Sequence, residues 1–278
     1  MNKQPCEPQV GADVEGFLYN PTDGKYVPCV GILPGTKDEP HQLPDMPKGF
    51  CVQEDNVMVE FNIPPAKTWK TFDLHVKHVV KGIRKMLPKN HEVHYKAAVQ
   101  FKTTDLTSDQ AQTIGCDPDF DAYAGGEIRA ECPTLTNWRG AGGHIHLGGD
   151  FQCPDFVAAL FADVCIGIQN GIIGSKPTRR DIWYGKPGIY RPKPYGIEWR
   201  SPSGEWAGMS DYYQYIGGSA MHLVRWLTTS DAKTLQAAFR AIDWTKIHNY
   251  LTFGKVQHDR ATERQIIIEQ ARKAGAPI

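Results

Sequence analysis

Two histidines stand between paired glycines in the segment RGAGGHIHLGG, residues 139–149. Alternate residues of a β-strand point to the same face, so His144 and His146 are predicted to share one face of a strand. The flanking glycines leave room for a ligand or another stretch of backbone to come close. A pair of packed histidines bonded to backbone would also fit, but two on one face favour a metal or phosphate site.

Three other segments repeat this two-residue spacing with acidic or polar side chains. They are GADVEGF with Asp13 and Glu15, VMVEFNI with Glu60 and Asn62, and YGIEWRS with Glu198 and Arg200. Two carboxylates on one face repel each other unless a cation lies between them, and a charged residue is rarely buried without a partner. A solvated strand face or a structural ladder of salt bridges remains an alternative. Four strands are nevertheless predicted to direct polar groups into one pocket.

The chemistry of this residue set points to phosphoryl transfer. Carboxylates with an imidazole suit Mg²⁺ or Mn²⁺ better than Zn²⁺, whose structural sites favour thiolates. Arg200 offers a planar fork to a phosphoryl group, and Arg191 and Lys193 precede it closely in the chain. Metals and arginines together neutralise a transferring phosphoryl group. Neither GxxxxGK[ST] nor GxGxxG occurs, so a nucleotide would be held by metal and sheet.

The first half of the chain, punctuated by Gly and Pro, is predicted to form strands and loops, and the last seventy residues are predicted to form helices. Alternation predicts strands at 12–18, 26–33, 57–63, 93–101, 127–132, 144–147 and 196–200. Helical periodicity predicts helices at 69–86, 155–173, 210–227, 232–242 and 261–274. Ser210 and Asp231 are the expected N-caps of two of them. The order predicts an α+β fold, a mostly antiparallel sheet with helices on one face.

Composition bounds the class of protein. A chain of 278 residues with 41% hydrophobic content can bury a large core. Lys plus Arg equals Asp plus Glu at 31 each, so charge does not indicate nucleic-acid or membrane-surface binding. Seven cysteines without a CxxC pair argue against a disulfide framework, and the N-terminus has no apolar signal region. We expect a cytoplasmic protein with no membrane partner; self-association into a homo-oligomer is left open.

Five segments in order resemble the phage carboxylate-amine ligases, the COOH-NH2 ligase type 2 family of the glutamine synthetase and glutamate-cysteine ligase superfamily. The segments are GADVEGF, VMVEFNIPPA, GCDPDFDAY, RGAGGHIHLGG and YRPKPYGIEWRSPSG. The ordered set is fairly specific, whereas any one motif alone would be weak. The resemblance implies a glutamine synthetase-like curved antiparallel sheet in a single catalytic domain of residues 1–278. Residues 11–204 would carry the motifs, residues 205–278 a helical part, and a phage-encoded chain would work in the host cytoplasm.

The resemblance also implies an activity and a set of site residues. Mg-ATP would phosphorylate a small-molecule or peptide carboxylate, and an amine would attack the acyl phosphate. The implied metal ligands are Asp13, Glu15, Glu60, His144 and Glu198. Arg200 would contact the transferring phosphoryl group, with further contacts to substrate or phosphate from Asn62, His146, Arg139 and Arg191. Asp13 stands where the wider superfamily often has Glu, so assignment to a particular metal stays open.

The acidic segment CDPDFDAY, residues 116–123, has two interpretations. Its turn-forming composition alone favours an acidic surface loop. The resemblance implies a substrate-facing loop instead. In that case Asp117 and Asp119 could recognise the attacking ammonium and act as its base.

Two alternative functions come from different classes of protein. His144 and His146 followed by Asp150 resemble the first half of a cupin motif, which would bind Fe, Mn or Ni in a jelly-roll barrel. That motif needs another histidine on a later strand, and His222 and His248 fall in strongly helical sequence. A catalytically inactive ligase fold used for binding is the other alternative. Its expected sign, loss of acidic ligands, is absent from the sequence.

Overall fold

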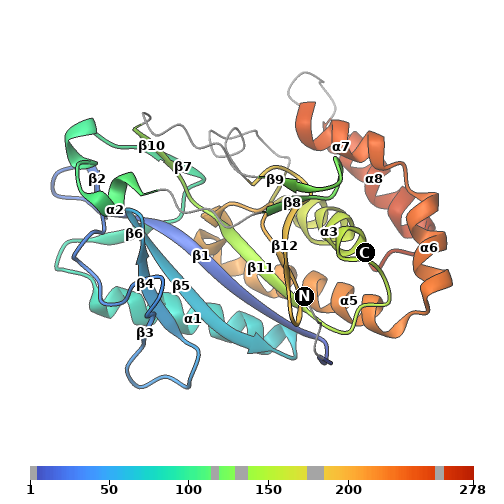
Figure 1. The fold of residues 1–278 in the computed structure, drawn as a ribbon, viewed down its shortest axis with the longest axis horizontal. Helices are drawn as coiled ribbons and strands as arrows, with labels where there is room; N and C mark the ends of the chain where they lie inside the picture. The colour runs from blue at the N-terminus through green and yellow to red at the C-terminus, as the bar shows by residue number, and fades with distance from the viewer. Residues whose placement is uncertain (1–4, 114–118, 129–136, 174–184, 254–259) are drawn as a thin grey trace.

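The computed structural model describes residues 5–113, 119–128, 137–173, 185–253 and 260–278. The strands are β1 (Gln9–Asn20), β2 (Lys25–Val27), β3 (His41–Gln42), β4 (Cys51–Asp55), β5 (Met58–Ala66), β6 (Glu92–His94), β7 (Ala98–Gln100), β8 (Asp119–Asp121), β9 (Glu127–Ile128), β10 (Trp138–Gly140), β11 (Gly143–Gly148), β12 (Ile189–Lys193) and β13 (Gly196–Trp199). Eleven of these strands in the described residues form one sheet of order β3-β4-β5-β1-β11-β13-β12-β8-β9, with β2 and β6 paired to β1. Every pairing is antiparallel, and β7 pairs with β10 separately. The long strand β1 lies at the centre of the large sheet (Figure 1).

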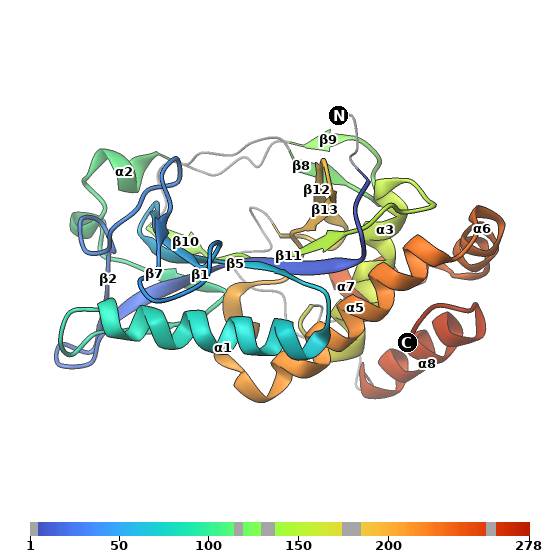
Figure 2. The ribbon, with the colours of Figure 1, turned by 90° about the horizontal axis from the view of Figure 1, so that it is seen from below.

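Most of the described helices cover one face of this sheet, and the short α2 lies on the other side (Figure 2). The helices are α1 (Trp69–Met86), α2 (Asp109–Gln112), α3 (Asp155–Ala162), α5 (Tyr213–Thr229), α6 (Ala232–Ala241), α7 (Trp244–Phe253) and α8 (Arg260–Lys273). Figure 2 shows α1 and α5 side by side beneath the sheet, with α6 and α8 beyond its end. The architecture is therefore the expected α+β arrangement with helices on one face. None of the helices that the structure describes is long and apolar enough to cross a membrane.

The two faces of β1 explain this layering. Ala12 and Val14 are buried in the main hydrophobic core, and the alternate positions 13 and 15 carry carboxylates. Helix α1 contributes a buried stripe at the expected 3.6-residue period, Phe72, Val76, Val79 and Ile83. Burial of such side chains stabilises the fold by roughly 2 kcal/mol each. The apolar face of the sheet thus packs against the helices. The polar face is available for function.

The predicted helices largely match those of the structure. The helix at 69–86 is confirmed in full, and the side chain of Thr68 accepts a hydrogen bond from the Thr71 amide at its start. The helix from 155 continues from α3 into a π-helical turn, residues 163–168, and ends before Gly171, whose φ is positive. Asp231 is confirmed as the N-cap of α6. Ser210 as an N-cap is wrong, because it lies in a 3₁₀ turn and α5 begins at Tyr213. Helix α7 was not predicted.

Several strand predictions are wrong or only partly correct. The predicted strand 26–33 ends at Val27, because the buried carboxylate of Glu54 accepts hydrogen bonds from the Gly31, Ile32 and Leu33 amides at 2.8–3.0 Å. The predicted strand 93–101 divides into β6 and β7, which belong to different sheets. Only β9 of the predicted strand 127–132 falls in the described residues. The short strands β3, β4, β8, β10 and β12 were missed, being too brief to show a clear period.

Candidate functional site

The register of the central strands gathers the predicted pairs on one sheet face. Asp13 on β1 lies opposite His144 on β11 and opposite Asn62 on β5. Glu15 on β1 lies opposite Glu60 on β5. On the other side of β11, His146 lies opposite Glu198 of β13, which in turn lies opposite Arg191 of β12. Segments up to 185 residues apart in the chain therefore form one polar face, with every alternate residue pointing the same way.

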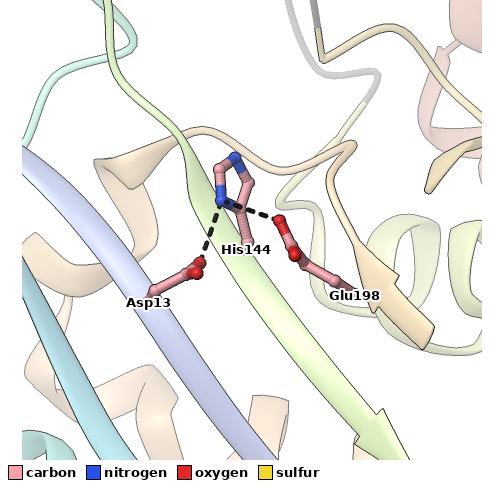
Figure 3. Close-up of side chains that lie close together, drawn as sticks. All are labelled: Asp13, His144 and Glu198. Carbon is pink, nitrogen blue, oxygen red and sulfur yellow. Dashed lines mark hydrogen bonds and ion pairs between the residues drawn. The ribbon is translucent and has the colours of Figure 1, made fainter. Parts of the chain in front are cut away.

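Asp13, His144 and Glu198 form the centre of this face (Figure 3). His144 Nδ1 lies 2.9 Å from Asp13 Oδ1 and 3.6 Å from Glu198 Oε1. The three side chains can each present one ligand atom within 4.8 Å of the others, which makes them a candidate metal site among the described residues. The other ring nitrogen of His144, Nε2, is buried and has no hydrogen-bond partner among the residues that the structure describes. Two carboxylates and one imidazole are a donor set suited to Mg²⁺ or Mn²⁺.

The pKa values of Asp13 and the two histidines are shifted by burial and by the charged groups around them. Burial opposes ionisation of Asp13, but His146 and His144 outweigh it and hold the pKa of that carboxyl well below its usual range. Burial and Arg200 lower the pKa of His144. His146 has Nε2 at 3.1 Å from Asp13 Oδ2 and Nδ1 at 2.8 Å from the Tyr195 hydroxyl. Its pKa is raised, because the attraction of Asp13 outweighs burial. Asp13 is therefore an ionised carboxylate between two histidines of unequal basicity.

Glu198 is a buried carboxylate among three cations. Arg200 Nη1 contacts Glu198 Oε1, Lys193 Nζ lies 2.7 Å from Oε2, and Arg191 Nη1 lies 3.7 Å from Oε1. Burial and Asp13 oppose ionisation of Glu198, yet Arg200 and His144 lower its pKa to about 2. Arg200 Nη1 also lies 3.3 Å from His144 Nδ1. A guanidinium thus contacts two of the three candidate metal ligands.

Asp119 joins the two arginines from the far side. Its Oδ1 lies 3.0 Å from Arg191 Nη2 and 3.1 Å from Arg200 Nε. The residue is only 4% exposed and belongs to β8, which pairs with β12. The acidic-surface-loop interpretation is therefore wrong for Asp119, because the pairing of β8 carries it into the sheet. Asp117 lies outside the described residues, and the role of either aspartate as a base stays a prediction.

Glu15 and Glu60 form the other half of the polar face. Glu15 Oε2 accepts a hydrogen bond of 2.6 Å from the Gly142 amide, and Glu60 Oε2 accepts one of 2.7 Å from Gln53 Nε2. Burial, Asp13 and Glu15 raise the pKa of Glu60 well above its usual range. Gln53 also accepts a hydrogen bond of 3.4 Å from Asn62. It lies on the unpredicted strand β4, and its neutral side chain gave no signal in the sequence.

The space left by the missing side chains of the glycines next to the histidines is filled by other parts of the same chain. A Cβ added at Gly142 would collide with Nε2 of His144, and one at Gly143 would collide with the Ser203 carbonyl. Close approach of another backbone is thus confirmed at Gly143. At Gly142 the neighbour is the imidazole ring itself, for which the missing side chain leaves the space.

Arg139 is the predicted site residue that the structure places elsewhere. It belongs to β10 in the separate two-stranded sheet. Its guanidinium donates to Asn56 Oδ1 at 3.0 Å and to the Ala111 and Trp138 carbonyls at 2.8 and 2.9 Å. These contacts tie α2 to the small sheet, and none of them involves the polar face described above.

Comparisons with known proteins add little to this geometry. No protein-family model matches the chain, and no curated protein matches it. One matching solved structure is the crystal structure of a bifunctional glutathione synthetase from Pasteurella multocida, with 9% sequence identity and a TM-score of 0.41. The match covers 98% of this chain and 48% of that one, so the chain spans about half the length of that protein. The comparisons therefore do not indicate a reaction, and the chemistry of the site has to be inferred from the side chains of the polar face.

Proposed function

We propose that the protein is an ATP-dependent carboxylate-amine ligase that forms an amide or isopeptide bond. One observation carries the proposal. The sheet register joins the carboxylates of Asp13 and Glu198 to His144 and places Arg191 and Arg200 beside them. Ligands for a hard cation and guanidinium groups for a phosphoryl group are the two requirements of phosphoryl transfer without a P-loop. The ordered motif resemblance to phage carboxylate-amine ligases points to the same reaction.

The residues fit a divalent cation. His144 Nδ1 lies 2.9 Å from Asp13 Oδ1 and 3.6 Å from Glu198 Oε1, and Asp13 is held ionised. Glu60, whose pKa is raised, would lose its proton readily beside an added positive charge. Bound with ATP, Mg²⁺ or Mn²⁺ would neutralise the β and γ phosphate oxygens. Asp13, His144 and Glu198 would hold it, with Glu15 and Glu60 as further acidic ligands.

The proposed reaction has two steps. A carboxylate oxygen of the first substrate attacks the γ-phosphorus of ATP, and the bond to the bridging oxygen breaks to release ADP. The amine nitrogen of the second substrate then attacks the acyl carbon, inorganic phosphate leaves, and the nitrogen loses a proton. Arg200 and Arg191 would neutralise the transferring phosphoryl group. Asn62 and His146 lie on the same face for contacts to ATP or substrate.

Calorimetric titration with a non-hydrolysable ATP analogue tests the nucleotide site without knowledge of the substrates. We expect binding that requires Mg²⁺ and is lost in Asp13→Asn and Glu198→Gln. Glu269→Gln, which removes a carboxylate on α8 that is 45% exposed and paired with Arg272, is the matched control and should bind as the wild type does. Magnesium-independent binding, or equal binding in all three variants, would reject the site.

Hydroxylamine trapping tests the acyl phosphate. The protein is incubated with Mg-ATP, hydroxylamine and pools of carboxylic acids, and acyl hydroxamate is measured together with ADP. A hydroxamate whose formation stops in Glu198→Gln supports the ligase and identifies the acid. Nucleotide binding with neither ADP nor hydroxamate from any pool would indicate the inactive ligase fold instead.

The cupin alternative is not favoured by the geometry. Asp150 is exposed, and the candidate metal group of the described residues contains His144 but neither His146 nor Asp150. His222 and His248 lie on helices α5 and α7, not on a later strand. The described strands also form a sheet with helices on one face, which differs from a jelly-roll barrel.

A further inference from the structure

A cavity of about 730 Å³ lies on the helical side of the molecule, between the first turn of α1 and one face of α5. Figure 2 shows these two helices beneath the sheet. They pack against the apolar side chains of β1, such as Ala12 and Val14, which alternate with the carboxylates of the polar face. The volume is within the range of small-molecule sites, roughly 300–1,000 Å³. None of the residues proposed for the ligase reaction lines it, so it requires an explanation of its own.

Aromatic side chains form the apolar part of the cavity. Trp69 and Tyr215 line it with 40% and 59% of their surface exposed, together with the buried Met221. Gly218 adds space, since a Cβ placed there would meet no atom of the described residues within 4 Å. Large aromatic rings left exposed around a hollow surface are typical of binding sites, because their burial by a ligand is favourable.

The charged side chains of the cavity have one sign. Lys70 and Arg225 line it, and no acidic residue is among the described residues that do. This contrasts with the chain as a whole, whose formal net charge is zero. Lys70 Nζ lies 5.5 Å from the centre of the Trp69 ring, so a cation and an aromatic surface are adjacent. The first turn of α1 contains no acidic residue, and its dipole adds to the positive potential.

We infer that this cavity binds an amphipathic anion, a small molecule with a planar apolar group and a carboxylate or phosphate. The planar group would stack on Trp69 and Tyr215, while the anionic group would lie near Lys70 and Arg225. Arg225 is already oriented, because its Nη2 donates to the Lys67 carbonyl at 3.2 Å beside the start of α1. The inference is independent of the proposed ligase reaction, since it uses other residues on the other side of the sheet.

Calorimetry with a matched series of naphthalene probes tests the class of ligand. The probes are 1-naphthoate, 1-naphthyl phosphate, neutral 1-naphthylmethanol and cationic 1-naphthylmethylamine. We expect the better anion to bind about tenfold more tightly than the neutral probe and the cation to bind least. The two anions distinguish a carboxylate ligand from a phosphate ligand. Equal affinity for neutral and anionic probes, or no binding of either anion, would overturn the inference.

Variants locate the binding. Lys70→Gln and Arg225→Gln should each weaken binding of the anion about threefold, and Trp69→Ala about tenfold. Lys81→Gln, which removes an exposed cation on α1 outside the cavity, is the control and should leave affinity unchanged. Circular dichroism establishes that each variant is folded. Asp13→Asn should also bind the anion normally. Loss of binding in Asp13→Asn but not in Trp69→Ala would assign the probe to the polar face and reject the cavity.

Discussion

The protonation of Glu60 depends on the assembled sheet. The residue is 7% exposed and lies opposite Glu15 across β1 and β5. Burial and the neighbouring carboxylates Asp13 and Glu15 raise its pKa well above the ordinary value of 4.5. Between pH 4.5 and the raised pKa, the folded protein therefore binds more protons than the unfolded chain. The free energy of unfolding must fall as pH rises through that window.

Glu60→Gln should remove this pH dependence. The amide keeps an oxygen for the bond from Gln53 and has no proton to lose. Within the window, each pH unit costs the wild type about 1.4 kcal/mol that the variant does not lose. Urea unfolding from pH 5 to pH 8 measures the difference. Calorimetry should show, in the same variant, loss of Mg²⁺-dependent nucleotide binding. The same slope of stability against pH in the variant and the wild type would contradict the raised pKa of Glu60.

Arg200 contacts the same side chains that a metal would use. Its guanidinium touches Glu198 and lies 3.3 Å from Nδ1 of His144. A divalent cation at Asp13, His144 and Glu198 would have to compete with it for Glu198. Displacement would leave Arg200 held by Asp119, 3.1 Å from its Nε, and would turn the guanidinium toward another anion.

Arg200→Gln and Arg200→Lys distinguish competition between the guanidinium and the metal for Glu198 from the effect of the positive charge alone. We expect Mn²⁺ affinity to rise about tenfold in Arg200→Gln. It should also rise about threefold in Arg200→Lys, because the ammonium lacks the fork that spans Glu198 and His144. Electron paramagnetic resonance of free Mn²⁺ gives both constants, with Arg225→Gln as a control. Arg200→Lys that binds like the wild type would show that only net charge matters.

At the scale of elements, the turn into β11 holds the site in shape. Gly142 donates its amide to Glu15, and its missing side chain leaves the space that the ring of His144 fills. The imidazole is directed toward Asp13 because β11 pairs with β1 and places the two residues opposite each other. The glycines of the motif therefore support the histidine as much as any ligand.

Gly142→Ala should destabilise the fold by about 1–3 kcal/mol, since neither the ring nor the backbone can move freely. Gly218→Ala is the matched control, because its Cβ would meet open space on helix α5. That variant should be more stable than the wild type by up to about 1 kcal/mol. Thermal unfolding compares the two. Similar effects of the two substitutions would contradict the packing around His144.

At the scale of the whole molecule, one buried carboxylate joins the helical layer to the sheet. Asp163, in the π-helical turn after α3, is completely buried. Its Oδ1 accepts hydrogen bonds of 2.8 Å from Trp199 Nε1 and 3.0 Å from the Ser201 hydroxyl. These residues are the two neighbours of Arg200 in the chain, so the helical layer fixes the backbone that carries Arg200. Burial raises the pKa of Asp163 to about 7, although its hydrogen bonds oppose the shift.

Asp163→Ala should cost about 2–4 kcal/mol, because the Trp199 and Ser201 donors would be buried without an acceptor. Asp163→Asn retains an acceptor oxygen and should lose much less. Wild-type stability should fall between pH 4 and pH 7, where the folded protein holds a proton that the unfolded chain has lost. Asp163→Asn should fall less steeply over that range in urea unfolding. Equal losses in the alanine and asparagine variants would rule out the acceptor role.

Sequence patterns alone determined the layers of this protein. Alternation in β1, β5, β11 and β13 predicted which side chains share a face, because the period of a strand is fixed by its backbone. The 3.6-residue stripe of α1 and the order of strands and helices predicted an α+β fold with helices on one side. The same alternation predicts five candidate site residues without any information on strand pairing: Asp13, Glu15, Glu60, His144 and Glu198.

Only the tertiary structure decided which of these residues meet. Local periodicity carries no information on strand order, so nothing in the sequence placed β1 between β5 and β11. The same pairing brought in Gln53 and Asp119 from short strands and left Arg139 on a separate sheet. It also set the charges, because the pKa values of Glu60 and Glu198 depend on neighbours contributed by other strands. A strand determines the direction of its side chains, and the register of the sheet determines their partners.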